Sequence, residues 1–378
     1  MSKIEELIQQ LCSNGVEWKT VGELCNLSRG KVYSKQYLSQ NEGEFPVYSS
    51  QTANNGELGK INSFDYDGEF LTWTTDGAYA GTIFHRKGKF SITNVCGLLK
   101  VVSKAMNIRF LYYWLSIKAK DHVYQGMGNP KLMSNQVSPI PVPLPSLPVQ
   151  EEIVRILDAF TSHAAELQAE LQARREQYEY YRNKLLSFEG DSSVEWLPME
   201  EVFDIRNGYT PSKSNQSYWE DGTIPWFRMD DIRQNGRILS DSIQHITQSA
   251  VKGGRFFPAN SIIVATTATI GEHALIISDS QANQRLDMKF FFYYMFIVDE
   301  WCKNNTNVSG FASVDMIKFR KLEIPIPPLS EQKRIVAILD KFEALVNDLT
   351  EGLPAEIAAR QEQYEYYRNK LLNFPKAV

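Results

Sequence analysis

The sequence has few of the residues that build redox or metal sites. Its four cysteines, Cys12, Cys25, Cys96 and Cys302, have no Cys-X-X-Cys spacing, and its five histidines have no metal-ligand spacing. No apolar run reaches the length of a signal peptide or of a membrane-spanning helix. These absences predict a cytoplasmic protein with reduced cysteines, no membrane contact and no bound metal.

Catalytic motifs are missing as well. A resident methyltransferase needs a glycine-rich cofactor loop and an Asn-Pro-Pro-Tyr pocket, but residues 126–130 lack the additional glycine and the second proline. Residues 56–60 lack the spacing of a P-loop and the Ser or Thr that follows its lysine. A nuclease could use Asp279 with Asp287 and Lys289, but this triplet is a weak signal and the apolar run after it indicates a core helix. We therefore predict that the chain is not an enzyme and binds no cofactor of its own.

The sequence also has no large excess of either charge, since 40 Lys and Arg residues and 45 Asp and Glu residues give a net charge of −5. Bulk charge alone therefore does not favour nucleic-acid binding, which draws on basic surface. The chain has enough apolar residues to form hydrophobic cores, because 43% of its residues are hydrophobic and 12% are aromatic. A chain of 378 residues with this composition has room for two or three folded domains.

A long internal repeat organises the chain. The sequence EQYEYYRNKLL occurs unchanged at residues 176–186 and 362–372. Upstream of each copy, QEEIVRILDAF at residues 150–160 matches QKRIVAILDKF at residues 332–342. The chain therefore consists of two halves built on one plan.

The repeat is also cyclic. Val-Glu-Trp at residues 194–196 follows the first repeat helix, and the same tripeptide stands at residues 16–18. We therefore expect the N-terminal segment to lie near the C-terminal end of the second repeat helix.

Each repeat predicts a long coiled-coil helix, because its apolar or bulky residues follow a 4-3 spacing. In the first repeat this seam contains one polar residue, Arg174, and consists of Ile153, Leu157, Phe160, Ala164, Leu167, Leu171, Arg174, Tyr178, Tyr181, Leu185 and Phe188. The seam of the second repeat is Ile335, Leu339, Phe342, Val346, Leu349, Leu353, Ile357, Arg360, Tyr364, Tyr367, Leu371 and Phe374.

The second repeat contains one extra helical turn, which carries Gly352 and Pro354. In a helix interior these residues cost about 1 and 3 kcal/mol relative to Ala, so we predict a kink or a break there. A homodimeric coiled coil is one interpretation of the seams. Two matching seams in one chain favour the other, antiparallel pairing of the two helices within the chain.

Two globular segments alternate with the helices. The first has strand-like runs at 45–50, 68–74, 81–86, 89–93 and 97–102, a helix at 108–118, a polar loop at 126–131 and a semi-rigid proline linker at 139–148. The second has two strands at 261–277 joined through Gly271, a buried helix at 290–298 and a matching linker at 324–328. A similar frame with different content is typical of two domains that bind different ligands.

These patterns carry a family resemblance that covers essentially the whole chain. The repeats ending in YEYYRNKLL, the Val-Glu-Trp entry to each half, the NGYTPS to DI stretch at 207–232, and SSQTANNG with the TDG of 75–77 resemble the specificity subunit of type I restriction-modification enzymes. The resemblance implies an α+β fold with a pseudo-twofold internal repeat: two mixed α/β target-recognition domains separated by two long antiparallel coiled-coil helices. We expect an N-terminal helix packed near the C-terminal helix (1–12), recognition domains at 13–148 and 191–329, and helical spacers at 149–190 and 330–378.

The resemblance also implies a function without catalysis. Each domain would read one half of a bipartite site in double-stranded DNA, and the helices would set the gap. The chain would bind two copies of an adenine methyltransferase subunit, which uses S-adenosylmethionine, and the complex would recruit a translocating endonuclease subunit that uses ATP and magnesium. The alternative is a duplicated coiled-coil scaffold whose globular domains bind proteins and read no DNA.

Candidate DNA-binding residues are the polar ones in loops, because base edges are read by Arg, Lys, Asn and Gln, while hydroxyls and backbone amides mostly contact phosphates. In the first domain these are Arg29, Lys31, Ser50, Gln51, Thr52, Asn54, Asn55, Thr74, Thr75, Asp76, Asn129 and Lys131. In the second they are Asn207, Tyr209, Thr210, Ser212, Lys213, Arg228, Asp230, Thr266, Thr267, Thr269, Asn283, Gln284, Arg285, Ser309 and Ser313. Candidates for binding a partner subunit lie in the duplicated helix ends: Tyr178, Tyr181, Arg182, Tyr364, Tyr367 and Arg368.

Overall fold

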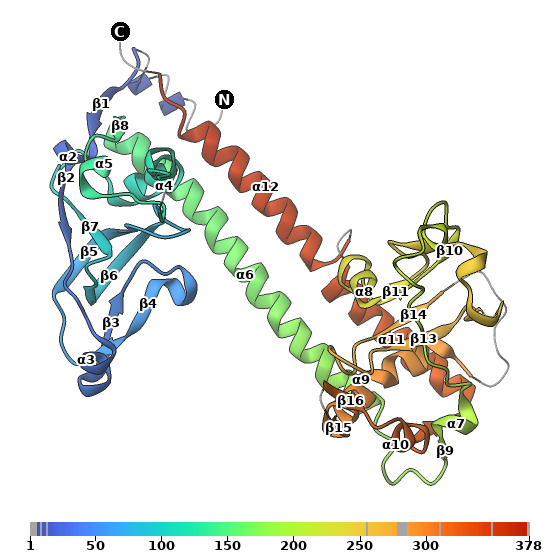
Figure 1. Cartoon of the computed structure of the whole chain (residues 1–378). Coiled ribbons are helices and arrows are strands. Elements are labelled where there is room, and N and C mark those ends of the chain that lie inside the picture. Colours follow the sequence, from blue (N-terminus) through green and yellow to red (C-terminus); the bar gives the residue numbers. More distant parts are fainter. Residues whose placement is uncertain are drawn as a thin grey trace. The chain divides into compact units, whose positions relative to one another are not determined.

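The computed structural model describes residues 6–7, 10–12, 14–126, 128–254, 256–277, 286–309, 311–348 and 351–375. The chain divides into two compact units: unit 1 is Met1–Leu167 with Ile357–Val378, and unit 2 is Gln168–Glu356. Each unit contains one globular domain of helices and strands and parts of the long helices (Figure 1). The predicted α+β class and internal repeat are confirmed. The five-part division by residue number is finer and stays a prediction.

The domain of unit 1 is built on a six-stranded sheet with the order β2-β7-β5-β6-β3-β4 (Figure 1). Its elements are β1 (Glu17–Thr20), α2 (Val21–Leu24), β2 (Cys25–Arg29), α3 (Lys35–Gln40), β3 (Glu42–Tyr48), β4 (Glu57–Ile61), β5 (Tyr66–Thr74), β6 (Ile83–Ile92), β7 (Cys96–Val101), α4 (Ile108–Lys118), α5 (Ser134–Val137) and β8 (Pro141–Leu144). Helix α4, as predicted, packs on β5 and β6. The core contains Leu71, Trp73, Phe110 and Leu111.

Strand β6 corrects one sequence prediction. The predicted strands at 81–86 and 89–93 form a single strand, which pairs with β5 from Ile83 to Phe90. Gly88 does not break the strand because it lies opposite Gly68. Gly88 has a φ angle of 94° and Gly68 one of 135°, which glycine adopts without strain. The pairing of β5 with β6 therefore continues on both sides of these two glycines.

The domain of unit 2 has several small sheets in place of one large one. Its elements are β9 (Glu195–Pro198), α7 (Met199–Val202), β10 (Ile224–Pro225), α8 (Met229–Asn235), β11 (Ile238–Leu239), β12 (His245–Ile246), β13 (Ser261–Val264), β14 (His273–Ile276), α9 (Met288–Asn304), β15 (Thr306–Ser309), β16 (Phe311–Val314), α10 (Met316–Arg320) and β17 (Glu323–Ile326). The predicted strands joined through Gly271 are confirmed as β13 and β14, which pair antiparallel in the sheet β11-β14-β13. The predicted buried helix is α9, which packs against both strands.

The two proline-rich segments fold as strands, which corrects their prediction as linkers. Strand β8 pairs antiparallel with β1, and β17 pairs antiparallel with β9, so Trp18 lies opposite Pro143 and Trp196 opposite Pro325. The Val-Glu-Trp repeat is therefore the pairing partner of the proline segment in both units. Proline cannot donate to a ladder, but a two-stranded sheet leaves alternate backbone positions outside the ladder and can hold it there.

The long helices follow the predicted seam. The first repeat is one helix of 39 residues, α6 (Leu147–Leu185), whereas the second is divided into α11 (Leu329–Asn347) and α12 (Leu353–Leu371). The predicted break is confirmed, with Pro354 in the first turn of α12, where its missing N–H costs no hydrogen bond. Gly352 lets the chain pass the end of α11, because a Cβ there would lie 2.5 Å from the Ala344 carbonyl oxygen.

The same aromatic contacts join the helices in each unit. In unit 1, the Phe160 ring lies 5.5 Å from the Tyr367 ring and 6.5 Å from the Tyr364 ring, measured between centroids. In unit 2, the Phe342 ring lies 5.9 Å from that of Tyr181 and 6.3 Å from that of Tyr178. These residues are matched in the repeat, so in both units the start of one repeat packs against the end of the other, as antiparallel pairing requires.

The cyclic repeat is closed inside unit 1. The Val16 N–H donates to the Pro375 carbonyl oxygen at 3.1 Å, and Cys12 is buried in the same cluster as Leu371 and Phe374. The segment before β1 therefore meets the segment after α12, as expected from the repeat.

A buried glutamine holds each domain on its helix. Gln150 in α6 is 0% exposed, and its Oε1 accepts from the Asn107 N–H at 2.8 Å, while its Nε2 donates to the carbonyls of Ala105 and Pro145 at 2.8 and 2.7 Å. Gln332 in α11 is also 0% exposed. Its Oε1 accepts from the Asp287 N–H at 2.8 Å, and its Nε2 donates to the Pro327 carbonyl at 2.8 Å.

The residues that these glutamines hold are helix caps. The side chains of Asn107 and Asp287 accept from backbone N–H groups in the first turns of α4 and α9. Each glutamine therefore ties together the start of a domain helix, the end of the proline strand and the long helix. We call this arrangement the glutamine clamp.

A second contact lies about two turns further along each long helix. The Tyr113 hydroxyl donates to Asp158 at 2.5 Å, and the Tyr293 hydroxyl donates to Asp340 at 2.6 Å. Burial and then the hydrogen bond to the carboxylate raise the pKa of both tyrosines, so both stay protonated donors. Arg109 and Lys289 add an ion pair to the same carboxylates, which are partly exposed and so gain little from it.

The clamp predicts a local loss of stability. The variant Gln150→Ala leaves a buried N–H and two carbonyls without their partner, and we expect unit 1 to lose about 3 kcal/mol in its free energy of unfolding. Gln332→Ala should do the same to unit 2. Hydrogen exchange of the full chain, resolved by segment, measures both.

The matched control is Gln172→Ala on the exposed face of α6, where the side chain, among the described residues, bonds to Glu176 alone. Its cost should stay within about 0.5 kcal/mol. Equal effects of Gln150→Ala and Gln172→Ala would contradict the clamp.

Candidate nucleic-acid interface

Four of the predicted DNA-binding segments meet around Thr75, at the end of β5. The Thr75 N–H donates to Ser50 Oγ at 3.3 Å, and Arg29 Nη2 donates to Thr75 Oγ1 at 3.3 Å. The Leu132 N–H donates to the Thr75 carbonyl at 2.8 Å, and Asp76 forms an isolated bridge with Lys131. The structure thus brings segments 29–31, 50–55, 74–76 and 129–131 together at one edge of the unit 1 domain.

A fifth segment at this edge, the β6–β7 turn at residues 93–95, was missed from the sequence. Arg29 Nη2 donates to the Asn94 carbonyl at 2.6 Å, and the Asn94 N–H donates to the Lys31 carbonyl at 3.0 Å. Thr75 Oγ1 donates to the Val95 carbonyl at 2.8 Å. The available signal was the polar Thr-Asn pair between two strand-like runs.

The structure corrects the prediction that Thr74 and Thr75 bind DNA, because these two residues are 0% and 1% exposed. The Thr74 hydroxyl donates to the Tyr79 carbonyl and accepts from the Thr82 N–H, and that of Thr75 is bonded inside the cluster. These hydroxyls hold the loops in place, and direct DNA contacts through them do not fit the structure.

The other unit 1 candidates reach the surface to different degrees. Those exposed are Arg29, Lys31, Gln51, Asn54, Asn55, Asn129 and Lys131, and those half-buried are Ser50, Thr52 and Asp76. Two exposed tyrosines in the same loops, Tyr79 and Tyr124, were missed; they are 63% and 65% exposed. Their signal was an aromatic residue inside a polar, glycine-containing loop.

Lys31 is held by a neighbouring carboxylate. Its Nζ lies 2.7 Å from Asp65 Oδ1, and the Tyr33 hydroxyl donates to the other oxygen at 2.6 Å. The hydrogen bond to Asp65 raises the pKa of Lys31. Burial alone would raise the pKa of Asp65, but the hydrogen bonds from Lys31 and Tyr33 lower it overall. Lys31 is therefore a charged donor with a fixed position.

In unit 2, residues 207–213 surround a pair of tryptophans. Trp226 and Trp219 meet edge to face at 4.9 Å, and their indole N–H groups donate to the carbonyls of Tyr209 and Ser212 at 3.2 and 3.0 Å. The Tyr209 hydroxyl donates to the Ala250 carbonyl at 2.5 Å. Asn207, Thr210, Ser212 and Lys213 are exposed on this frame, and Tyr209 is half-buried.

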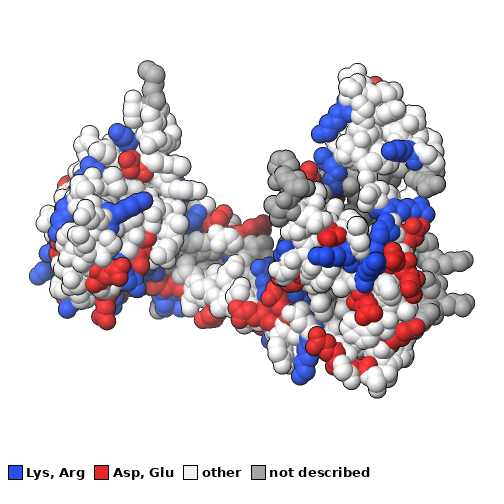
Figure 2. All heavy atoms as spheres, turned by 60° about the horizontal axis from the view of Figure 1, so that its bottom comes forward, with Lys and Arg blue, Asp and Glu red and all other residues white. Residues whose placement is uncertain are grey.

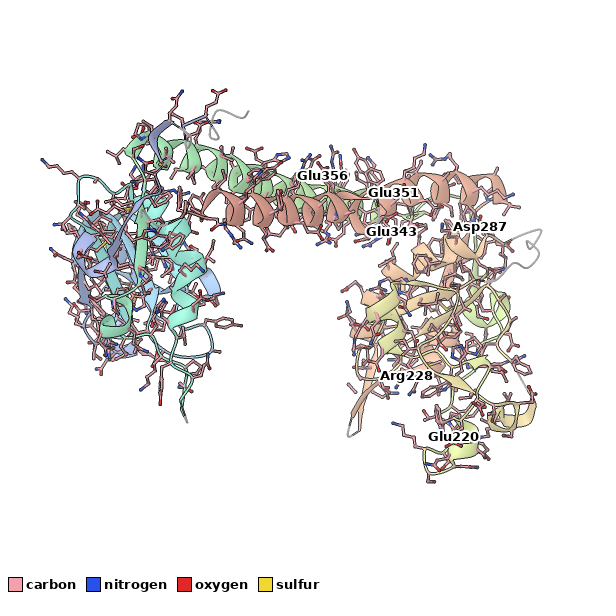
Figure 3. The ribbon with its side chains drawn as sticks, turned by 90° about the horizontal axis from the view of Figure 1, so that it is seen from above. Glu220, Arg228, Asp287, Glu343, Glu351 and Glu356 are labelled. Carbon is pink, nitrogen blue, oxygen red and sulfur yellow. The ribbon has the colours of Figure 1, made fainter. Side chains whose placement is uncertain are left out.

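The Arg228 segment is held by a buried carboxylate. Asp231 is 0% exposed, and it accepts from the backbone N–H of Arg228 at 2.5 Å and of Ile243 at 2.6 Å. The Arg228 guanidinium, half-buried, lies 5.1 Å from the Trp226 ring, and the half-buried Asp230 lies 3.6 Å from it. Figure 3 shows Arg228 further from α11 than Asp287, which lies next to α11.

Thr266 and Thr267 meet a different neighbour. The Val314 N–H donates to the Thr266 carbonyl at 2.9 Å, and Thr267 forms an isolated bridge with Ser313. This matches the Thr75–Leu132 and Asp76–Lys131 contacts of unit 1. Thr267 is exposed, whereas Thr266, Thr269 and Ser313 are half-buried. No hydrogen bond among the described residues of unit 2 joins this group directly to residues 207–213, so the second set is brought together less completely.

Four candidates need separate mention. Asn283, Gln284 and Arg285 lie outside the described residues. Ser309 is the last residue of β15.

A hollow of about 490 Å³ lies beside the 266–269 loop. It is lined by Arg237, Ala268, Thr269, Ile270, Glu272, Asp299 and Lys303. Its charges are of both signs, and the Asp299 carboxylate is already bonded to the buried His273 ring at 2.9 Å. The lining therefore favours no particular ligand.

The helical candidates are used partly for packing. Tyr178 is 5% exposed and Tyr364 half-buried, as members of the seam. Arg182 lies 4.2 Å from the Phe296 ring, and Arg368 5.2 Å from that of Tyr364. Tyr181 and Tyr367 are 38% and 41% exposed. The most exposed tyrosines of the repeat are two others, Tyr180 and Tyr366, at 60% and 61%.

The surface carries charges of both signs. On the face shown in Figure 2, basic and acidic residues are interspersed on each unit. Among the described residues, no group of three or more His, Cys, Asp or Glu side chains is arranged to hold a metal ion, and none of their helices is long and apolar enough to cross a bilayer. Recognition by this chain must therefore rest on placed side chains more than on overall charge.

Comparison with known proteins decides the family. The model of the type I restriction modification DNA specificity domain matches residues 14–176 and 192–359, once in each half. The chain belongs to this specificity-domain family. The resemblance seen in the sequence is thereby confirmed.

Relatives in the specificity-domain family match different shares of the chain. The specificity subunit of the type I restriction enzyme EcoR124I/EcoR124II of Escherichia coli is 35% identical over 416 aligned residues, covering 100% of this chain and 98% of that protein. The EcoprrI specificity subunit, also of E. coli, is 54% identical over 201 residues, covering 48% of this chain and 50% of that protein. The crystal structure of a type I restriction-modification S subunit from M. genitalium has the same fold, with a TM-score of 0.57 at 14% identity over 95% of this chain and 96% of that one.

Asp231 provides a test of how the second specificity domain is organised. The variant Asp231→Ala removes the shared, buried acceptor of two part-buried N–H groups, which costs about 2 to 5 kcal/mol. We expect faster hydrogen exchange at Arg228 and Ile243, with unit 1 unchanged. Asp230→Ala is the matched control, because Asp230 is the residue before Asp231 in the chain. Its own side chain is 49% exposed and forms surface ion pairs with Arg228 and Arg233. Loss of protection in both variants alike would show that burial of Asp231 is not what holds the segment.

Proposed function

We propose that this chain reads a bipartite site in double-stranded DNA as the specificity subunit of a type I restriction-modification complex, one half-site per domain. The supporting observation is the arrangement repeated in both units. A glutamine clamp fixes each domain to a long helix, and each domain presents polar loops whose contents differ from those of the other. Two domains that attach to the helices in the same way but carry different loops are suited to reading two different DNA sequences.

The proposal includes no chemistry in this chain. Methyl transfer would belong to the methyltransferase subunit with S-adenosylmethionine, and cleavage to the endonuclease subunit with ATP and magnesium. The missing cofactor motifs and the mixed charges of the hollow in unit 2 support this division. The scaffold alternative would need protein-binding surfaces on the domains, whereas the loops at residues 50–56 and 207–213 are polar and rich in Asn, Ser and Thr, which suits nucleic acid better.

A methylation assay tests the function. The purified chain alone should transfer no methyl group to DNA. With the methyltransferase subunit and S-adenosylmethionine, it should direct adenine methylation to a single bipartite motif, read by sequencing. Methylation by the chain alone would contradict its role as a non-catalytic subunit, and methylation without a bipartite motif would contradict the reading of two half-sites.

The exposed tyrosines of the repeat suit a partner surface. Tyr180 and Tyr366 occupy matched positions, and the aromatic and cation–π contacts of their rings within the described residues are with the next tyrosine and, for Tyr180, with Lys184. Packing of the helices does not require them, yet the eleven-residue stretch around each is identical in the two halves. One such surface per unit would bind two copies of the same methyltransferase subunit.

Substitution of these tyrosines tests the surface. Tyr180→Ala should remove one methyltransferase copy from the complex, because an exposed aromatic at the centre of an interface carries about 2 kcal/mol of binding energy. Tyr366→Ala should remove the other copy, and the double variant both, with thermal stability unchanged. Native mass spectrometry at limiting concentration counts the subunits, with Gln172→Ala as the helix-surface control. Full occupancy in the double variant would place the interface elsewhere.

A further inference from the structure

A buried cation lies directly beneath a candidate reading loop in unit 1. Arg86, in β6, is 3% exposed, and its guanidinium lies between the rings of Tyr48 and Phe84, at 3.6 and 4.3 Å from their centroids. Its Nη2 donates to the Asn55 carbonyl at 2.8 Å, and its Nε donates to Thr72 Oγ1 at 3.2 Å. Arg86 therefore joins the sheet to the loop at residues 50–56.

Arg86 has no direct ion pair. Within the described residues, no carboxylate oxygen forms an ion pair with it. Burial lowers the pKa of Arg86, but a guanidinium stays protonated at any physiological pH. A buried charge without a direct ion pair is costly, and two aromatic rings, two neutral acceptors and the Glu57 carboxylate, which lies beyond ion-pair distance, offset only part of that cost. A buried arginine in β6 that bonds to the loop at residues 50–56 therefore points to a use for its charge.

The loop above Arg86 has an unusual backbone. Asn54, Asn55 and Gly56 are three successive residues in the left-handed region, with φ of 48°, 52° and 78°. Asparagine tolerates this conformation better than other non-glycine residues, but normally as a single residue, so three in succession need support from the surroundings. Support comes from Arg86 at the Asn55 carbonyl, and the contact is close, because a Cβ on Gly56 would lie 3.0 Å from Nη2.

The loop carries no charge of its own. Its sequence from Ser50 to Gly56 is SQTANNG, with Gln51, Asn54 and Asn55 exposed. Asparagine and glutamine amides read base edges by paired donors and acceptors, which demands a fixed position. The only cation that a hydrogen bond of the described residues links to this loop is Arg86. A charge in a buried site is also screened less by salt than one at the surface.

We propose that Arg86 is a positioning residue for DNA reading: it fixes the left-handed turn of the 50–56 loop and gives that loop a positive potential, without touching the DNA. This inference rests on the proposed function and adds to it which loop of unit 1 reads its half-site. A phosphate contact by Arg86 is excluded by its burial. The discrimination between bases should therefore depend on Arg86, whereas the number of protein–phosphate contacts should not.

The test compares duplex binding by the full chain in complex with the methyltransferase subunit. The duplexes are the motif found by methylation, the same motif with either half-site changed, and an unrelated sequence. For Arg86→Met, which keeps an unbranched stem in the buried site and removes the guanidinium with its charge, we expect discrimination at one half-site to fall roughly tenfold, as for loss of one charged hydrogen bond. Discrimination at the other half-site should stay as in the unsubstituted chain.

Salt dependence separates positioning from contact. For Arg86→Met, the slope of the logarithm of affinity against the logarithm of salt concentration should not change, because no phosphate contact is lost. Lys131→Met is the matched control: it removes an exposed charge from the same edge of the domain. It should weaken binding to every duplex and lower the slope by about one.

Gly56→Ala approaches the same contact from the loop side. The added Cβ would be strained at φ 78° and would press on Arg86 Nη2, so it should reproduce the half-site effect while keeping the charge. Agreement between the two variants supports the proposal even where one lowers thermal stability. The half-site affected should differ from the one affected by Asp231→Ala in unit 2.

Two results would overturn the inference. Full discrimination in both Arg86→Met and Gly56→Ala would remove the loop from reading. A reduced salt slope in Arg86→Met would make Arg86 a phosphate contact. Failure of the unsubstituted complex to discriminate any half-site is a separate outcome and would count against the proposed function itself.

Discussion

The buried glutamine in each long helix is the constraint on which the arrangement within each unit depends. Gln150 and Gln332 have no exposed surface, so their amide groups must find every partner inside the protein. They find them in the cap of a domain helix and the carbonyl of a proline strand. A domain that failed to present those backbone groups would leave a buried amide unpaired. The helix therefore accepts domains by backbone geometry, and the loops at the other end of the domain are free to differ.

Reading in this chain depends on positioning more than on charge. The net charge is −5, and three basic residues at or beneath the candidate interface of unit 1 are held by hydrogen bonds within the domain. Arg29 is bonded to Thr75 and Asn94, Lys31 to Asp65, and Arg86 to Asn55. Each bond reduces the freedom of a side chain or loop before any ligand arrives, which lowers the entropy lost on binding. A near-neutral protein with preorganised loops gains sequence discrimination at the expense of nonspecific attraction.

The sequence predicted the helical frame well because identity and periodicity carry that information directly. The seam residues of α6 are buried or half-buried, except for Tyr181, and the break at Gly352 and Pro354 follows from their backbone preferences. The proline strands were missed because proline is normally read as a strand breaker. Only pairing with Val-Glu-Trp, more than a hundred residues away, shows that these segments are strands.

The candidate interface was predictable in part. The sequence singled out polar loops as candidates for DNA contact, and the structure brings four of those in unit 1 together. Residue type alone could not tell a buried hydroxyl such as Thr75 from an exposed amide such as Asn54. Arg86 was missed for a related reason: in sequence it is an ordinary strand residue, and its burial under the loop arises from the pairing of β5 with β6 and of β3 with β6.

The central claim is that attachment and reading are separate properties of each unit. The most direct measurement is methylome sequencing of a host whose chain has residues 192–328 replaced by another recognition domain. The incoming domain should keep a helix cap followed six residues later by tyrosine, as Asp287 and Tyr293 are spaced here. The account predicts a motif in which one half-site changes while the other half-site and the gap stay the same. A change in both half-sites, or in the gap alone, would contradict it.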